Sequence, residues 1–141
     1  MGQTNSKLQS QRKEPSAIKR FFSSRKNSFH YAGRGLVNAI RTQKNARIHL
    51  TMTILVIFAS ICLGLTRMEW VAILMVIGMV WIAELINTSL ESIVDMTSPE
   101  RHPLAQVGKD VAAAAVLLAA IVSVIVGILV LGPALISKLG W

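Results

Sequence analysis

The stretch from Trp81 to Asp95 constrains this chain most, because it begins as apolar, membrane-like sequence and then acquires carboxylates without losing helical character. On a helix its polar residues fall at i, i+3, i+4, i+7 and i+11, which predicts one polar stripe. These residues are Glu84, Asn87, Thr88, Glu91 and Asp95. Carboxylates inside a membrane span are costly and usually face a protein interior or a wet cavity, so the stripe predicts a functional site.

The apolar run before this stripe is too short to cross a membrane alone. It extends from Trp70 to Ala83, about 14 residues or about 20 Å. The hydrocarbon core is about 30 Å thick, so the helix must continue through Glu84 within the core. Glu91, about 10 Å further along, should reach the boundary. This length disfavours the alternative, a water-exposed helix that merely continues a span.

The composition fits a small membrane protein with one basic end. Of the 141 residues 52% are hydrophobic, yet the formal net charge is +8. Most of the 15 Lys and Arg residues lie at or before Arg47, where only Glu14 opposes them. A nucleic-acid arm could be equally basic, but the long apolar segments that follow favour an anionic membrane surface as the partner, with no nucleic acid.

The pattern predicts an all-α integral membrane protein with an N-terminal amphipathic surface helix and three transmembrane helices. Residues 1–28 are expected to form a basic, disordered cytoplasmic tail ahead of one membrane domain over 29–141. The expected elements of that domain are a surface helix over 29–47 and spans over about 48–65, 70–95 and 111–136. Small residues recur every four positions in the third span, at Ala115, Ala119, Ser123 and Gly127, and predict a helix-packing face.

The distribution of cations predicts the orientation. With the N-terminus in the cytoplasm, that side holds the early Lys and Arg residues together with Arg101 and Lys109, whereas the other side holds only Arg67 and Lys138. The positive-inside rule therefore places the N-terminus and the connection over 96–110 in the cytoplasm. The lower end of the acidic stripe then faces the compartment that contains nucleotide and magnesium.

Two carboxylates seven residues apart on one face can support both metal binding and base chemistry. Magnesium takes few protein carboxylates and relies on phosphate oxygens for much of its shell, which suits Glu91 at the water boundary. Glu84, deeper, suits acceptance of a proton from an alcohol, and Lys109 can hold phosphate as a point charge. The sequence has no Walker-type glycine loop and no protein-kinase signature. Residue chemistry alone leaves open phosphoryl transfer at the membrane surface and a proton or ion pathway.

The same residues resemble the prokaryotic diacylglycerol kinase family, which includes undecaprenol kinases. The resemblance is carried by the pattern E-x-x-N-x-x-x-E-x-x-x-D over 84–95, by the HPLA sequence at 102–105 and by Lys109-Asp110, and it extends from about Phe29 to the third span. It implies a homotrimer of three-span protomers in the plasma (inner) membrane of a prokaryote. It also implies Mg²⁺- and ATP-dependent phosphorylation of a lipid alcohol, with active sites shared between neighbouring protomers.

The resemblance also implies roles for individual residues. By matching positions, Glu84 would be the catalytic base, Glu91 would bind the divalent metal, Asn87 would help to place the phosphates and Lys109 would contact phosphate. The other residues implied around the nucleotide are Tyr31, Glu100, His102 and Asp110. The HPLA and KDVAA sequences are closer to the undecaprenol kinases than to the diacylglycerol kinases, although no identified residue reads the lipid tail.

Two positions depart from the family pattern. Gln43 stands where the family commonly has a second metal-binding Glu, and it offers a neutral carbonyl oxygen without charge. Ser24 stands at a family Arg, although Arg25 adjoins it. Gln43 motivates one alternative function, a catalytically weak family member that serves as a membrane assembly partner. A small oligomeric ion or proton conductor is the other alternative, because it would use the same intramembrane acids.

Overall fold

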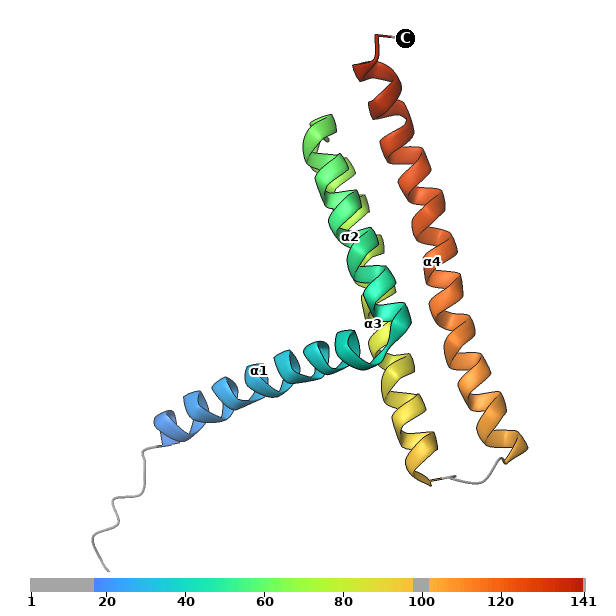
Figure 1. Ribbon diagram of the computed structural model, residues 1–141. Coiled ribbons are helices and arrows are strands. Elements are labelled where there is room, and N and C mark those ends of the chain that lie inside the picture. The colour runs from blue at the N-terminus through green and yellow to red at the C-terminus, as the bar shows by residue number, and fades with distance from the viewer. Residues whose placement is uncertain (1–16, 98–101, 141) are drawn as a thin grey trace, which may run out of the picture. The chain divides into compact units, whose positions relative to one another are not determined.

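The computed structural model describes residues 17–97 and 102–140, and all regular structure within these ranges is helical. The helices are α1 (Ala17–Thr42), α2 (Lys44–Leu63), α3 (Arg67–Thr97) and α4 (Pro103–Lys138), as Figure 1 shows. Helices α2, α3 and α4 are long and apolar enough to cross a membrane. The all-α class and the three predicted spans are therefore confirmed. The chain divides between Gly35 and Leu36 into two compact units, and these three helices belong to the second.

The first helical boundary differs from the expected one. Helix α1 begins at Ala17, within the segment expected to be a tail, and ends at Thr42 rather than at Arg47. The chain leaves the helical conformation at Gln43 (φ −97°, ψ 127°) and re-enters it at Lys44. The segment expected as one surface helix over 29–47 thus contains the end of α1 and the start of α2. Sequence signals for helix ends rely on Gly and Pro, and neither residue stands at this break. Residues 1–16 of the expected tail lie outside the described residues.

Helices α2 and α3 form a helical hairpin with a three-residue connection over 64–66. Gly64 ends α2 in the left-handed conformation (φ 71°, ψ 44°), which glycine adopts without steric cost. Thr66 precedes α3, and Glu69 Oε2 accepts hydrogen bonds of 2.7 Å from both the Thr66 N–H and the Thr66 hydroxyl. This arrangement resembles a capping box, in which the residue three positions into a helix bonds back to the cap. Arg67 to Glu69, expected in the turn, therefore belong to α3.

Helix α4 begins earlier than the sequence pattern indicated. It starts at Pro103, not near Lys109, and His102 is its N-cap, with Nδ1 accepting a hydrogen bond from the Leu104 N–H at 3.2 Å. Proline is tolerated in the first turn because its missing N–H would have no partner there. The helix thus begins within 96–110, the segment that was expected as a connection. Pro133 lies inside α4, which continues to Lys138.

Helices α2, α3 and α4 lie side by side in the second unit, and each contacts the other two (Figure 1). The buried residues of α4 are mostly small, namely Ala112, Val116 and Ala119, and small residues let helices approach closely. Ala115, expected in this packing face, is exposed instead. Trp81 Nε1 donates a 3.1 Å hydrogen bond to Thr53 Oγ1 and so joins α3 to α2. Most large apolar side chains of the spans face outward, as a lipid environment allows.

Candidate functional site

Glu84 is completely buried, with a relative exposure of 0%. It lies on α3, and its Oε2 is 4.0 Å from Nε2 of His49 on α2. The main chain of Ala46 also interacts with this carboxylate. Neither Glu84 oxygen has a partner in hydrogen-bond geometry among the described residues. Because buried polar groups are nearly always hydrogen-bonded, an unpartnered buried carboxylate marks a position where a ligand group can complete the bonding.

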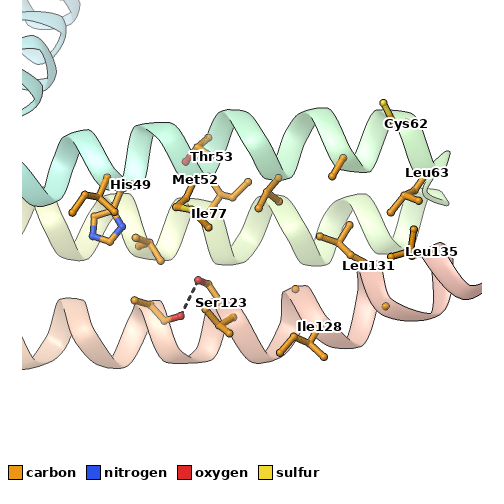
Figure 2. Close-up of a pocket in the computed structure, with 18 residues that line it drawn as sticks. His49, Met52, Thr53, Cys62, Leu63, Ile77, Ser123, Ile128, Leu131 and Leu135 are labelled. Carbon is orange, nitrogen blue, oxygen red and sulfur yellow. Dashed lines mark hydrogen bonds between the residues drawn. The ribbon is translucent and has the colours of Figure 1, made fainter.

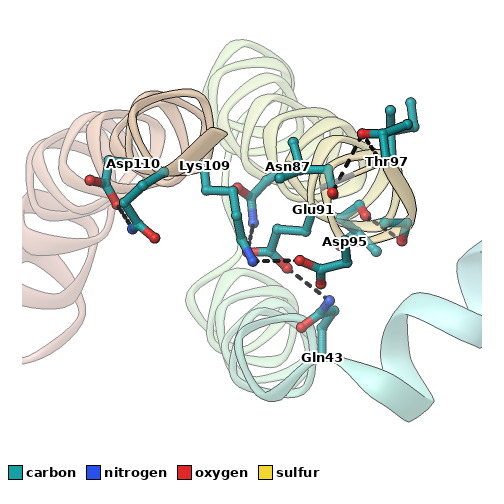
Figure 3. A network of polar contacts seen from close by, with 12 residues as sticks. Gln43, Asn87, Glu91, Asp95, Thr97, Lys109 and Asp110 are labelled. Carbon is teal, nitrogen blue, oxygen red and sulfur yellow. Dashed lines mark hydrogen bonds and ion pairs between the residues drawn. The ribbon is translucent and has the colours of Figure 1, made fainter. Parts of the chain in front are cut away.

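Two turns further along α3, Glu91 lies in a different environment. Its Oε1 accepts a 3.1 Å hydrogen bond from Nδ2 of Asn87, and its Oε2 accepts a 3.0 Å hydrogen bond from Nε2 of Gln43. Figure 3 shows the Gln43 and Asn87 side chains converging on this carboxylate. Gln43 reaches it because the break between α1 and α2 places this residue beside α3. The structure therefore brings together the predicted metal-binding Glu and the residue that replaces the second family Glu.

Helix α4 adds a cation to this cluster. Lys109 Nζ donates a 2.8 Å hydrogen bond to Asp95 Oδ1 in an ion pair that joins α4 to α3 (Figure 3). The ammonium group also interacts electrostatically with Glu91. Lysine and two acidic residues thus lie at the same end of the α2–α3–α4 unit. We call this group, together with Gln43 and Asn87, the polar cluster.

Of the remaining predicted site residues, Asp110, His102 and Tyr31 lie within the described structure. Asp110 accepts a 2.7 Å hydrogen bond from Gln106 within α4 and has no bond to the polar cluster. His102 caps α4 and is exposed. Tyr31 belongs to the first compact unit, where its ring contacts His30 edge-on with centroids 6.1 Å apart. Glu100, like the side chains of Ser24 and Arg25, lies outside the described residues.

His49 is the site residue that sequence reasoning missed. It lies near the start of the span predicted over about 48–65, where its residue type alone does not mark it. The signal that identifies it is its distance along the helix from the hairpin connection. His49 lies about 14 residues before the end of α2, and Glu84 lies about 17 residues after the start of α3. Both residues are therefore about 20–25 Å from the same connection. A comparison of positions across the two antiparallel helices would have paired them.

The donors around Glu91 fit a hard divalent cation. Glu91 supplies a carboxylate, and the side-chain amides of Gln43 and Asn87 supply neutral oxygens once they turn. Magnesium is usually bound through one or two carboxylates, with phosphate oxygens and waters completing its shell. Within 17–97 and 102–140, no three His, Cys, Asp or Glu side chains are grouped closely enough to hold a metal. These residues therefore suit a cation bound together with phosphate rather than an all-protein cage.

The three spans and the polar cluster define a multi-pass membrane protein with a polar site at one end of its helical unit. Residues 30–131 match the prokaryotic diacylglycerol kinase family. The match covers well over half of the chain, so the protein belongs to this family, and the enzyme class that the family defines is lipid kinase. The resemblance indicated by the E-x-x-N-x-x-x-E-x-x-x-D pattern is confirmed.

Individual relatives agree with this family. The chain is 37% identical over 118 residues to the undecaprenol kinase of Bacillus subtilis, a match that covers 84% of this chain and 93% of that protein. It is 46% identical over 111 residues to a diacylglycerol kinase of Synechocystis, covering 78% of this chain and 63% of that protein. The diacylglycerol kinase of Haemophilus influenzae is 30% identical over 93 residues, covering 66% of this chain and 79% of that protein. The chain thus spans less than two thirds of the Synechocystis relative.

Proposed function

We propose that this protein transfers a phosphoryl group from ATP to the hydroxyl of a lipid alcohol, undecaprenol or diacylglycerol, at the cytoplasmic face of a prokaryotic plasma membrane. One observation carries the proposal: a buried, unpartnered Glu84 lies two turns from Glu91, which is surrounded by amide and ammonium groups. The first carboxylate suits a reaction with a membrane-embedded alcohol, and the second suits a charged, water-soluble nucleotide.

Glu84 is the proposed catalytic base. Its carboxylate is buried against α2. Among the described residues, no group donates a hydrogen bond to it. A lipid hydroxyl that enters this position would donate its hydrogen to Glu84, which would take the proton as the oxygen attacks phosphorus. Such a positioned base typically contributes about 10²–10⁴-fold to a rate. Positioning and charge stabilisation supply most of the rest in phosphoryl transfer.

Glu91, Gln43 and Asn87 are proposed to hold Mg²⁺ that is bound with ATP. When bound, this ion neutralises charge on the transferring phosphates. Lys109 is proposed to contact phosphate, since its ammonium lies beside the same carboxylates and can exchange Asp95 for a phosphate oxygen. Tyr31, Glu100, His102 and Asp110 remain proposed nucleotide-site residues on the family resemblance alone.

A cavity of about 800 Å³ provides a place for the lipid chain. It is lined mainly by α2 and α4, with Ile77 and Val80 from α3, and Figure 2 shows its predominantly apolar side chains. His49 lines the cavity and lies 4.0 Å from Glu84, so the cavity ends one side chain away from the proposed base. An apolar chain in the cavity would place its terminal hydroxyl beside Glu84.

The orientation and assembly are also proposals. The basic early segment favours a cytoplasmic N-terminus, which puts Glu91 and Lys109 on the side that contains ATP. The family resemblance supports a homotrimer with active sites shared between protomers. The outward-facing apolar side chains of α2, α3 and α4 are compatible with contacts either to lipid or to other protomers.

The test is transfer of labelled phosphate from ATP to undecaprenol and to diacylglycerol, offered separately to purified protein in lipid with Mg²⁺. We expect Mg²⁺-dependent transfer, with undecaprenol as the better acceptor because the HPLA and KDVAA sequences resemble undecaprenol kinases. A clear preference for diacylglycerol would overturn the acceptor assignment. No transfer to either lipid by folded, trimeric protein would overturn the activity and favour the assembly-partner alternative that Gln43 motivates.

A further inference from the structure

We propose that His49 binds the acceptor hydroxyl jointly with Glu84, so that one substrate oxygen bridges the two side chains. The inference deepens the proposed function and rests on it, because it adds a substrate-binding residue to the reaction in which Glu84 is the base. It assigns to α2 a direct part in positioning the lipid alcohol.

The separation between the two side chains supports a bridging oxygen. His49 Nε2 and Glu84 Oε2 are 4.0 Å apart, which exceeds the usual 2.7–3.2 Å of a direct hydrogen bond. A single oxygen can lie about 2.8 Å from both atoms, a normal hydrogen-bond distance to each. The side chains are 16% and 1% exposed, respectively, so the bridge would form in a largely dry place where hydrogen bonds are strong.

Among the residues that line the cavity, His49 is the polar side chain placed beside Glu84. The other hydroxyl side chains that line the cavity already hydrogen bond within the protein: Thr53 accepts from Trp81 at 3.1 Å, and Ser123 donates to the Ala120 carbonyl at 3.0 Å. Figure 2 shows Thr53 and Ser123 further along the cavity than His49. His49 is thus the cavity-lining polar residue that also faces the buried carboxylate.

The chemical step balances with ATP as the phosphoryl donor. The His49 Nε2–H donates a hydrogen bond to the substrate oxygen and keeps its proton throughout. The hydroxyl proton passes to Glu84 as the oxygen forms a bond to the γ-phosphorus, and the bond from that phosphorus to the departing ADP oxygen breaks. One face of the substrate oxygen is therefore held by His49, which leaves a lone pair directed to phosphorus.

The experiment compares His49→Leu and His49→Gln with wild type in lipid, with Ile54→Leu as a control on α2, at an exposed side chain that does not line the cavity. The readouts are kcat and KM for the preferred lipid alcohol and KM for ATP. We expect His49→Leu to lower kcat/KM for the lipid by about tenfold or more, the factor expected for loss of one hydrogen bond. His49→Gln should recover part of this loss because its amide can donate, and KM for ATP should stay unchanged in both variants.

Two results would overturn the inference. One is wild-type lipid kinetics in His49→Leu. The other is an equal loss in both His49 variants accompanied by a higher KM for ATP, which would show a general disturbance of the helices. An active wild type with an equally active His49→Leu would refute the role of His49 alone. A wild type that phosphorylates no lipid alcohol would instead refute the proposed function, and the inference with it.

Discussion

Glu84 and Glu91 are identical side chains two turns apart on α3, yet the structure surrounds them differently. Glu84 is fully buried, has one histidine within 4.0 Å and has no hydrogen-bond partner in the described structure. Glu91 is half-buried, and each of its oxygens accepts a hydrogen bond from a side-chain amide. The comparison shows that one stripe places the same residue type in two environments, and the environment of a carboxylate decides which role it can take.

The two positions also differ in the elements that build them. Helix α2 approaches Glu84 through His49 and Ala46. The surroundings of Glu91 are assembled from the break between α1 and α2, from α3 itself and from α4. Changes at Glu84 should therefore affect chemistry and leave the helical unit intact, whereas changes near Glu91 should affect ion binding and the contacts between helices.

The largest expected effect tests the Glu84 half of this contrast. Glu84→Gln should lower the rate of phosphate transfer by about 10²–10⁴-fold, because the amide cannot accept the hydroxyl proton. Thermal unfolding in detergent should not show lower stability, because the substitution exchanges one buried polar group without a hydrogen-bond partner in the described structure for another of the same shape. Turnover like that of the wild type would show that Glu84 is not the base.

The Gln43→Glu variant tests whether Glu91 belongs to a cation site. The second carboxylate should lower the Mg²⁺ concentration for half-maximal activity by roughly threefold to tenfold, since ligand charge tunes cation affinity. Without Mg²⁺ the same variant should unfold at a lower temperature than wild type, because two acids replace a 3.0 Å hydrogen bond. The matched control is Gln106→Glu, which also puts an acid beside a hydrogen-bonded acid, Asp110, but outside the polar cluster. An equal effect of Mg²⁺ on both variants would contradict a cation site at Glu91.

The smallest expected effect concerns the edge of the polar cluster. Asp95→Asn removes one charge of an ion pair whose side chains are 68% and 32% exposed for Asp95 and Lys109, respectively. Exposed pairs contribute little to stability, so the unfolding temperature should change by no more than about 4 °C. Because the variant leaves Lys109 freer to meet phosphate, KM for ATP should fall slightly. A large loss of stability would show that this pair joins α3 and α4 structurally.

The helical class was predictable because long apolar runs and a helix-spaced polar stripe specify it directly. The positions of the helix ends were less predictable, because the same residue types can either begin a helix or interrupt one. Pro103 opens α4 although prolines also break helices, and Glu69 caps α3 although acids also populate turns. At Gln43 the helix breaks without any residue typical of a break.

The candidate site was partly predictable for a related reason. Glu84, Asn87 and Glu91 share one helix, so their common face follows from spacing alone. Two other features depend on how α2 and α3 are aligned along their axes. These features are the contact between Glu91 and Gln43 and the proximity of His49 to Glu84. That alignment is fixed by the ends of the hairpin, which the sequence pattern placed only approximately. The roles of all the predicted site residues, including Tyr31 and Glu100, stay predictions.

The hairpin connection also bears on how the chain enters a membrane. Helices α2 and α3 are joined by three residues, and the charged residues next to that connection are Arg67 and Glu69, which carry opposite charges. In the proposed orientation, only this short and nearly neutral segment has to cross the bilayer, while the basic residues that precede α2 stay where they were synthesised. The pair can therefore insert as one unit, and the opposition of His49 and Glu84 would be established during biosynthesis, before α4 is added.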